Sequence, residues 1–117
     1  MGVTHVEGAV TGPSGKQRSL QFLVDSGATY TVLPHDAWQA IQLAPKRRMT
    51  FRLADGTPIE RDISECHIAI VEQECHTPVI LGEPGDEALL GMVTLEELGL
   101  VLNPFRRTLQ PMQMRLA

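Results

Sequence analysis

Hydrophobic and polar residues alternate over short stretches along most of the chain. A period of two is typical of half-buried β-strands, and the alternation repeatedly ends at Gly, Pro, Asp or Ser, which favour turns. The pattern therefore predicts a mainly β fold. The predicted strands cover residues 5–10, 19–24, 31–33, 49–53, 57–63, 64–71, 76–81, 100–102 and 108–116.

Turn residues join neighbouring strands into hairpins. The segment TGPSGK at residues 11–16 separates the first two strands and supplies Gly-Pro and Ser-Gly turns. Asp55-Gly56 lies between two β-type runs, and this dipeptide is a strong hairpin signal. The EQE segment at residues 72–74 connects a further pair of strands.

Two segments predict short helices. Pro34 precedes residues 35–43 (HDAWQAIQL), whose apolar positions are near helical spacing. Farther along, Thr94 is predicted as the N-cap of a helix that ends at Leu98, with Glu97 completing a capping box. Together with the strands, these helices predict one domain, residues 1–117, folded as a small closed β-barrel or sandwich.

Composition and charge narrow the function classes. Hydrophobic residues make up 43% and charged residues 21% of the 117, as in globular proteins. The net charge of −4 argues against a nucleic-acid surface, and the basic cluster at residues 46–48 is interpreted as a solvated loop. No apolar run approaches the ~20 residues of a membrane span, and the N-terminus lacks a secretory pattern. We expect a cytoplasmic protein that contacts neither nucleic acid nor membrane.

The two cysteines are each followed by a histidine, as Cys66-His67 and Cys75-His76. Their spacing does not match the usual zinc motifs, and adjacent residues on a strand point to opposite faces. The sequence therefore predicts two buried thiols and two surface imidazoles, with no metal and no cofactor.

An aspartate interrupts one apolar stretch. Residues 22–34 read FLVDSGATYTVLP, so Asp25 lies between two runs that are both predicted as strands. Burying an isolated charge costs several kcal/mol unless a partner or a shifted pKa relieves it. Asp25 is therefore either a turn residue that binds its own backbone or a carboxylate presented for acid–base chemistry.

The wider pattern resembles the retropepsin-like aspartic proteases, and is similar also to the protease domain of the DNA-damage-inducible proteins. Their active-site motif reads D-[ST]-G-[AS] between apolar strands, as at residues 25–28 here, and Ser26 stands where Thr is commoner. Their second signature, two apolar residues and a Gly before a short helix, matches Leu89, Leu90 and Gly91. The Asp-Gly hairpin lies between the two signatures, where these proteases have a flap over the substrate.

The resemblance implies a role for each of these residues. Asp25 is expected to be catalytic, the flap to span residues 49–63, and the hydroxyl of Ser26 to donate to the opposite subunit. Charged residues on the hairpin, Arg52, Glu60 and Arg61, predict a more polar substrate-facing side than in the viral enzymes. The expected active-site loop comprises Ser26, Gly27, Ala28 and Thr29; the flap tip comprises Ala54, Asp55, Gly56 and Thr57; and the loop-supporting residues are Leu89, Leu90 and Gly91.

The chemistry requires two carboxylates that share one proton, so that one acts as base and the other as acid. Only one D-S-G motif is present, so the second Asp25 must come from a second chain. The sequence thus predicts a homodimeric aspartic endopeptidase that cleaves peptides or proteins. Ala28 offers no hydroxyl to stabilise the ionised form of the two Asp25 carboxylates, so we expect the activity to have a mildly acidic pH optimum. Two alternatives stay open: a catalytically silent dimerisation or peptide-binding module, and a monomeric β-domain in which Asp25 is a turn residue.

Overall fold

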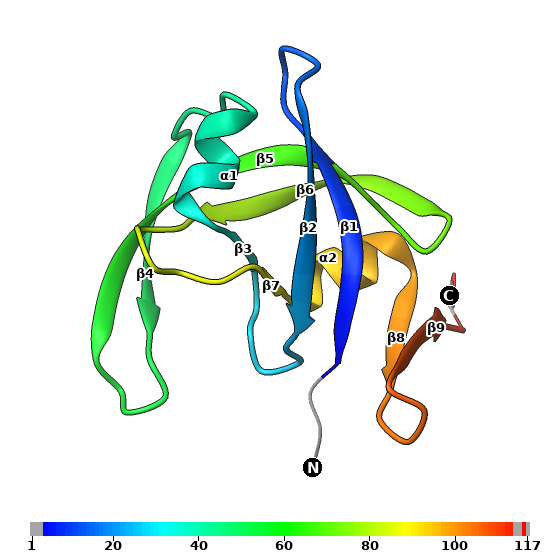
Figure 1. Ribbon diagram of the computed structural model, residues 1–117. Helices are drawn as coiled ribbons and strands as arrows, with labels where there is room; N and C mark the ends of the chain where they lie inside the picture. The colour runs from blue at the N-terminus through cyan, green and yellow to red at the C-terminus, as the bar shows by residue number, and fades with distance from the viewer. Residues whose placement is uncertain (1–3, 114–115, 117) are drawn as a thin grey trace.

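A computed structural model describes residues 4–113 and residue 116. The described residues form nine strands and two short helices (Figure 1). The predicted strand at residues 108–116 lies partly outside the described residues. In chain order the elements are β1 (His5–Thr11), β2 (Gln17–Val24), β3 (Thr31–Leu33), α1 (His35–Ala40), β4 (Arg47–Arg52), β5 (Pro58–Ile70), β6 (Gln73–Leu81), β7 (Leu89–Leu90), α2 (Met92–Leu98), β8 (Leu100–Asn103) and β9 (Thr108–Pro111).

Seven strands form one sheet in the order β1-β2-β7-β3-β6-β5-β4. β1 also pairs with β5, through residue pairs such as Ala9 and Ala69, so six of these strands form a ring and β4 extends beyond it. The β8-β9 hairpin is a separate two-stranded sheet. The predicted mainly β fold with two short helices is confirmed.

Hydrophobic side chains fill the space inside the ring and beneath α2. Their burial follows the alternation seen in the sequence, because successive strand residues face opposite sides of the sheet. Removing these side chains from water is the main source of stability. The largest that are fully buried are Phe22, Leu33, Ile41, Ile68, Ile70, Leu90 and Leu100.

The predicted break between residues 63 and 64 is wrong, because β5 runs without interruption from Pro58 to Ile70. Its first half pairs with β4 and its second half with β6. Ile63 and Ser64 are both buried although they are neighbours, so the inside–outside alternation shifts by one residue there. That shift accounts for the two strands expected from the pattern.

The predicted capping box on α2 is wrong as well. The helix begins at Met92 with Gly91 as its N-cap, so Thr94 lies inside the first turn and its hydroxyl is buried. The helix ends at Leu98 as predicted, and Gly99 follows it in the left-handed conformation at φ 70°. No helix among the described residues is long and apolar enough to cross a membrane.

Two boundaries differ from expectation near α1. The helix ends at Ala40, earlier than the predicted residue 43. The basic residues Arg47 and Arg48 are not in a loop but begin β4, where they are solvent-exposed.

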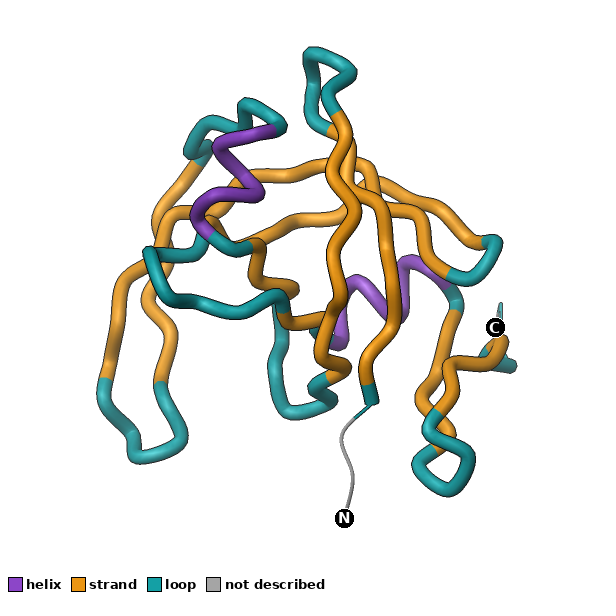
Figure 2. The backbone as a smooth tube through the Cα atoms, in the orientation of Figure 1, coloured by secondary structure: helices purple, strands orange, loops and turns teal. Residues whose placement is uncertain are grey.

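Three connecting segments project toward the same side of the molecule. In the tube view, the tip of the β4-β5 hairpin, the loop at residues 25–30 and the tip of the β8-β9 hairpin all lie at the lower edge (Figure 2). The ring of strands thus serves as a scaffold that presents the Asp25 loop at one end of the protein.

Candidate active site

The Asp25 loop connects the end of β2 to the start of β3 and spans residues 25–30. Apolar residues of the two strands are anchored in the core, and the small residues Ser26, Gly27 and Ala28 allow a tight turn between them. The backbone N–H of Ala28 donates to the carbonyl oxygen of Asp25 (3.1 Å), which closes this turn.

β7 brings the second sequence signature next to this loop. It is inserted between β2 and β3, with Leu23 opposite Leu89 and Val24 opposite Leu90 in parallel register. Val32 of β3 lies opposite Leu89 on the other side. Leu90 is fully buried and its carbonyl oxygen accepts the N–H of Asp25 (3.1 Å). The signatures at residues 25–28 and 89–91 are therefore neighbours in space.

Gly91 lies directly against the backbone of the Asp25 loop. A Cβ atom at this position would be 2.5 Å from the carbonyl carbon of Tyr30 and 2.9 Å from the carbonyl oxygen of Thr29. Only a residue without a side chain allows such a close approach of two backbone segments.

Gly91→Ala should therefore destabilise the protein and displace the loop. Because the clash is with backbone atoms, we expect a loss of about 2–3 kcal/mol in unfolding free energy, a drop in melting temperature of more than about 5 °C, and a loss of activity. Thermal unfolding measures the first effect. A melting temperature within about 2 °C of wild type would contradict the close contact.

The carboxylate of Asp25 is partly exposed, and one of its oxygens holds the turn. Oδ1 accepts the N–H of Gly27 at 2.9 Å, whereas no residue of the described chain donates a hydrogen bond to Oδ2. Ser26 and Thr29 are exposed, and their hydroxyls make no hydrogen bond within the described chain. The loop thus combines an ordered carboxylate with polar groups that are open to a ligand or another chain.

The predicted Asp-Gly hairpin is formed by β4 and β5. Arg52 and Pro58 are its last paired residues, so the turn contains Ala54 to Thr57, and Gly56 adopts φ 89°. Asp55 Oδ1 accepts the N–H of Thr57 (2.9 Å), and hydrogen bonds from Thr57 lower the pKa of the Asp55 carboxyl. The ionised form of Asp55 therefore stabilises this turn, and that contribution is lost as the pH falls through its lowered pKa.

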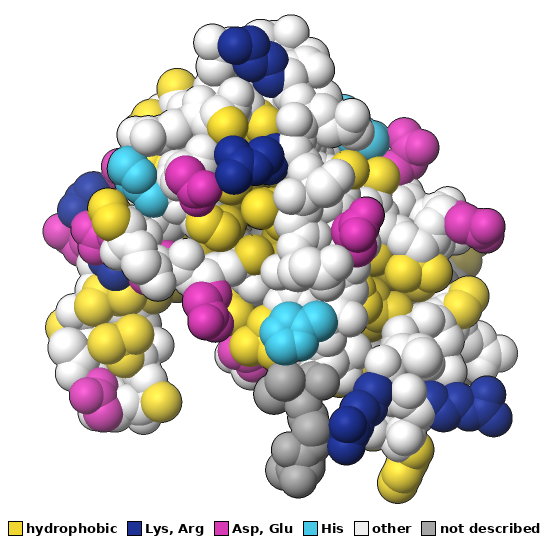
Figure 3. Space-filling view, in the orientation of Figure 1, with side chains coloured by type: hydrophobic (Ala, Val, Ile, Leu, Met, Phe, Trp, Pro, Cys, Tyr) yellow, Lys and Arg dark blue, Asp and Glu magenta, His cyan; other side chains and the backbone are white. Residues whose placement is uncertain are grey.

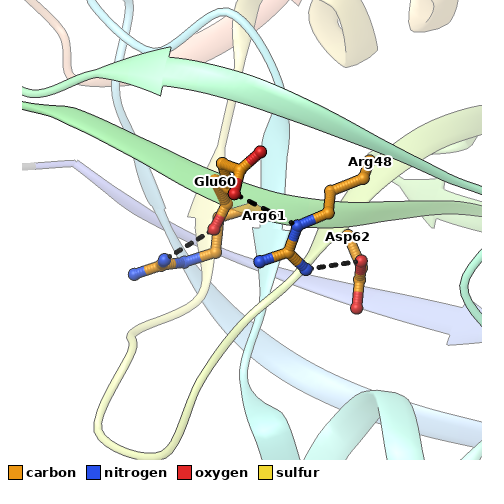
Figure 4. Close-up of polar contacts among 4 residues, drawn as sticks. All are labelled: Arg48, Glu60, Arg61 and Asp62. Carbon is orange, nitrogen blue, oxygen red and sulfur yellow. Dashed lines mark hydrogen bonds and ion pairs between the residues drawn. The ribbon is translucent and has the colours of Figure 1, made fainter.

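Charged side chains cross the hairpin between β4 and β5. Arg48 lies 3.1 Å from Asp62 and 3.6 Å from Glu60, and Arg61 donates to the carbonyl oxygen of Glu60 (Figure 4). Arg61 also forms an ion pair of 3.1 Å with Glu83, which lies in the segment that leads to β7. Exposed pairs of this kind contribute little stability each. The contact between Arg61 and Glu83 links the hairpin to that segment.

A cavity of about 390 Å³ lies between the Asp25 loop, the β4-β5 hairpin and the segment before β7. In the space-filling view, the hairpin stands away from the body and leaves a hollow (Figure 3). Tyr30 and Phe51 meet edge-to-face across the cavity, with ring centres 5.9 Å apart. The walls are formed by Gly27, Ala28, Thr29, Tyr30, Val32, Phe51, Arg52, Leu53, Ile59, Arg61, Ile80, Asp86, Glu87 and Leu89.

The cysteine and histidine pairs lie outside this cavity. Burial raises the pKa of the Cys66 thiol to about 12, and the nearby Cys75 adds to the shift. Cys75 is only half-buried, so the prediction of two buried thiols is wrong for this residue. His67 and His76 lie across β5 and β6 with ring centres 5.5 Å apart. No group of three or more metal-binding side chains is found among the described residues.

A larger cavity, of about 570 Å³, borders these residues. It is lined by the β1-β2 turn, the segment after α1 and part of β5, and it contains none of the predicted site residues. The smaller cavity contains Gly27, Ala28, Thr29 and Leu89 of the predicted site residues, and is therefore the one next to the predicted site. Asp25 itself and the flap-tip residues 54–57 do not line it.

Residues 14–97 match the protein family described as "gag-polyprotein putative aspartyl protease". This match covers more than half of the chain. The chain belongs to this aspartyl protease family, and the predicted resemblance to retropepsin-like aspartic proteases is confirmed. No curated protein matches the sequence significantly.

A solved structure agrees with the fold of this aspartyl protease. The solution structure of the simian foamy virus (mac) protease is similar to the chain with a TM-score of 0.56 and 20% sequence identity. The similarity covers 79% of this chain and 91% of the viral one.

Several cavity residues of the aspartyl protease were not predicted as site residues. Tyr30 and Phe51 carry no motif, and only the fold brings them together. Arg61 lies two residues from Ile59 on one strand, and this spacing indicates that both side chains face the same side. Arg52 and Arg61 line the cavity, and Glu60 does not.

Proposed function

We propose that this aspartyl protease is an endopeptidase that acts as a homodimer, with Asp25 of each chain in one shared active site. The observation that carries the proposal is the ordered Asp25 loop beside a cavity, with one such loop in each chain. Family membership supports the protease chemistry, and the need for two carboxylates supports the dimer.

The proposed reaction uses the two Asp25 side chains in different protonation states. Two carboxylates about 3 Å apart cannot both ionise, so the pair holds one proton. The ionised Asp25 removes a proton from a water molecule as that water attacks the peptide carbonyl carbon, and the protonated one donates to the carbonyl oxygen. The Gly27 N–H and the Leu90 carbonyl hold each Asp25 in place.

Peptide or protein segments are the proposed substrates. The β4-β5 hairpin would act as a flap, because it forms one wall of the cavity and its tip is free of the ring of strands. Apolar walls with Arg52 and Arg61 at the hairpin side suit a peptide that carries both apolar and polar side chains.

Gly56→Val should lower turnover about three- to tenfold through the flap. Gly56 adopts φ 89°, which a β-branched residue resists, so the turn is misdirected or stiffened. Gly15→Val is a matched control, since Gly15 has φ 87° and, like Gly56, open space around its Cβ position, but belongs to the β1-β2 turn. Equal kinetic effects in the two variants would show that the hairpin is not a flap.

Peptide-library cleavage tests the proposed function directly. The purified protein is incubated with the library between about pH 4 and 8, and the products are sequenced by mass spectrometry. We expect cleavage at internal peptide bonds with a mildly acidic pH optimum, since Ala28 offers no hydroxyl to favour the ionised form of the Asp25 pair. A folded dimer that cleaves nothing would favour the silent binding module, and a monomer would favour the turn interpretation of Asp25.

A further inference from the structure

Three threonine side chains from three different elements meet in the core beneath the Asp25 loop. They are Thr31 of β3, Thr94 of α2 and Thr77 of β6, and each is at most 1% exposed. The hydroxyl oxygen of Thr94 lies 2.6 Å from that of Thr31 and 2.8 Å from that of Thr77. Buried hydroxyls are retained in a core only where they are hydrogen-bonded.

The groups at the two ends of this chain of hydroxyls determine which hydroxyl donates to which. At one end the N–H of Gly91 donates to Thr31 Oγ1 (3.1 Å), and at the other the hydroxyl of Thr77 donates to the carbonyl oxygen of Pro78 (3.4 Å). A carbonyl can only accept, so Thr77 must in turn accept from Thr94, and Thr94 from Thr31. Each of the three hydroxyl hydrogens then has an acceptor.

The Gly91 end of the chain is also where α2 meets the active-site loop. The first N–H groups of a helix have no partners within it, and here the loop supplies them. The N–H of Met92 donates to the carbonyl oxygen of Ala28, and the N–H of Val93 to that of Thr29, each at 2.9 Å. The position of α2 therefore sets the position of the loop backbone.

We propose that Thr94 is a positioning residue for Asp25, which acts through Thr31, Gly91 and the first turn of α2. The inference rests on the proposed function, because it assigns Thr94 a part in the same active site. The role of Thr94 is more than filling space in the core. Thr94 lies in the middle of the hydroxyl chain, so its hydroxyl both accepts from Thr31 and donates to Thr77. Without it, Thr31 must turn to find another acceptor, and the N–H of Gly91 loses its partner.

Two substitutions of Thr94 separate the hydroxyl from the packing volume. Thr94→Val keeps the shape of the side chain and removes the hydroxyl, whereas Thr94→Ser keeps the hydroxyl and removes a methyl group. We expect kcat of Thr94→Val to fall about ten- to a hundredfold with KM changed less than about threefold, because the reacting groups are misplaced but the cavity walls remain. Thr94→Ser should keep kcat within about threefold of wild type, although the lost methyl lowers its melting temperature.

Ile68→Val is the control for a general loss of stability. Ile68 is fully buried in β5 and belongs to no hydrogen bond of the threonine chain. It should lower the melting temperature as Thr94→Ser does and leave kcat unchanged. A kcat for Thr94→Val within about threefold of wild type, or an equal loss in Thr94→Ser, would overturn the proposal.

Hydrogen exchange at the Gly91 amide tests the hydrogen bonds of the three threonines without depending on peptide cleavage. This N–H should be protected in the wild type and in Thr94→Ser, and should exchange at least about tenfold faster in Thr94→Val. If the wild type cleaves no peptide, the proposed function fails, and the exchange rates alone decide whether Thr94 positions the loop. Equal exchange in all three proteins would overturn the positioning role whatever the activity.

Discussion

Asp25→Asn is expected to lower kcat/KM by about a thousandfold or more while the fold and the proposed dimer persist. Asn has the same shape as Asp and can keep the hydrogen bond from the Gly27 N–H through its side-chain oxygen. It cannot take a proton from water, so the general base is lost, which costs about two to four orders of magnitude by itself. Peptide cleavage gives the rate, and circular dichroism and sedimentation report on fold and assembly.

Asp36→Asn is the matched control for this change. Asp36 lies in α1, where it forms an ion pair with Arg18 and is 74% exposed. The same chemical change there should leave activity within about twofold of wild type, since an exposed ion pair contributes little. Residual activity of Asp25→Asn within tenfold of wild type would refute the catalytic role of Asp25.

Activity per chain should fall as the protein is diluted below the dissociation constant of the dimer. One Asp25 loop per chain and a reaction that needs two carboxylates make the rate second-order in protein at low concentration. Adding excess Asp25→Asn chains to wild type should also suppress activity, because heterodimers then carry only one working carboxylate. Cleavage assays across a dilution series and across mixing ratios measure both effects.

Ser26→Ala should shift this dilution curve to higher protein concentration. The hydroxyl of Ser26 is exposed and makes no hydrogen bond within the described chain, so it is available to a partner. One net hydrogen bond contributes about 1 kcal/mol. Two of them, one from each chain, would therefore change the dissociation constant roughly ten- to a hundredfold. Flat specific activity on dilution, together with no suppression in the mixtures, would show that one chain is sufficient.

Local chemistry made much of the fold predictable from the sequence. Asp55-Gly56 specifies a tight turn wherever it stands between β-type runs, and Gly99 can end a helix in the left-handed conformation without strain. The strands were predicted because each has one face in the core and one face in water. These signals depend on a few neighbouring residues, so one sequence is enough to show them.

Long-range contacts account for what could not be predicted. Threonine is a residue type that favours the N-cap position, so Thr94 was expected there. The N–H groups at the start of α2 instead donate to the backbone carbonyls of Ala28 and Thr29. Every residue has such a carbonyl, so the sequence gives no sign of which ones will accept these bonds. The insertion of β7 between β2 and β3 is likewise a matter of topology, since a strand of two residues has almost no pattern of its own. The resemblance to a known family placed Leu89 and Leu90 near Asp25, whereas periodicity alone could not.

The bonds between the Asp25 loop and α2 also bear on the timing of protein synthesis. A ribosome makes Asp25 before the partners of its loop at residues 90–93, which follow about 65 residues later. At about 5–20 residues per second, this interval is on the order of ten seconds. An unfinished chain therefore carries the aspartate without the strand and helix that hold it in place, and cannot present it in the native geometry.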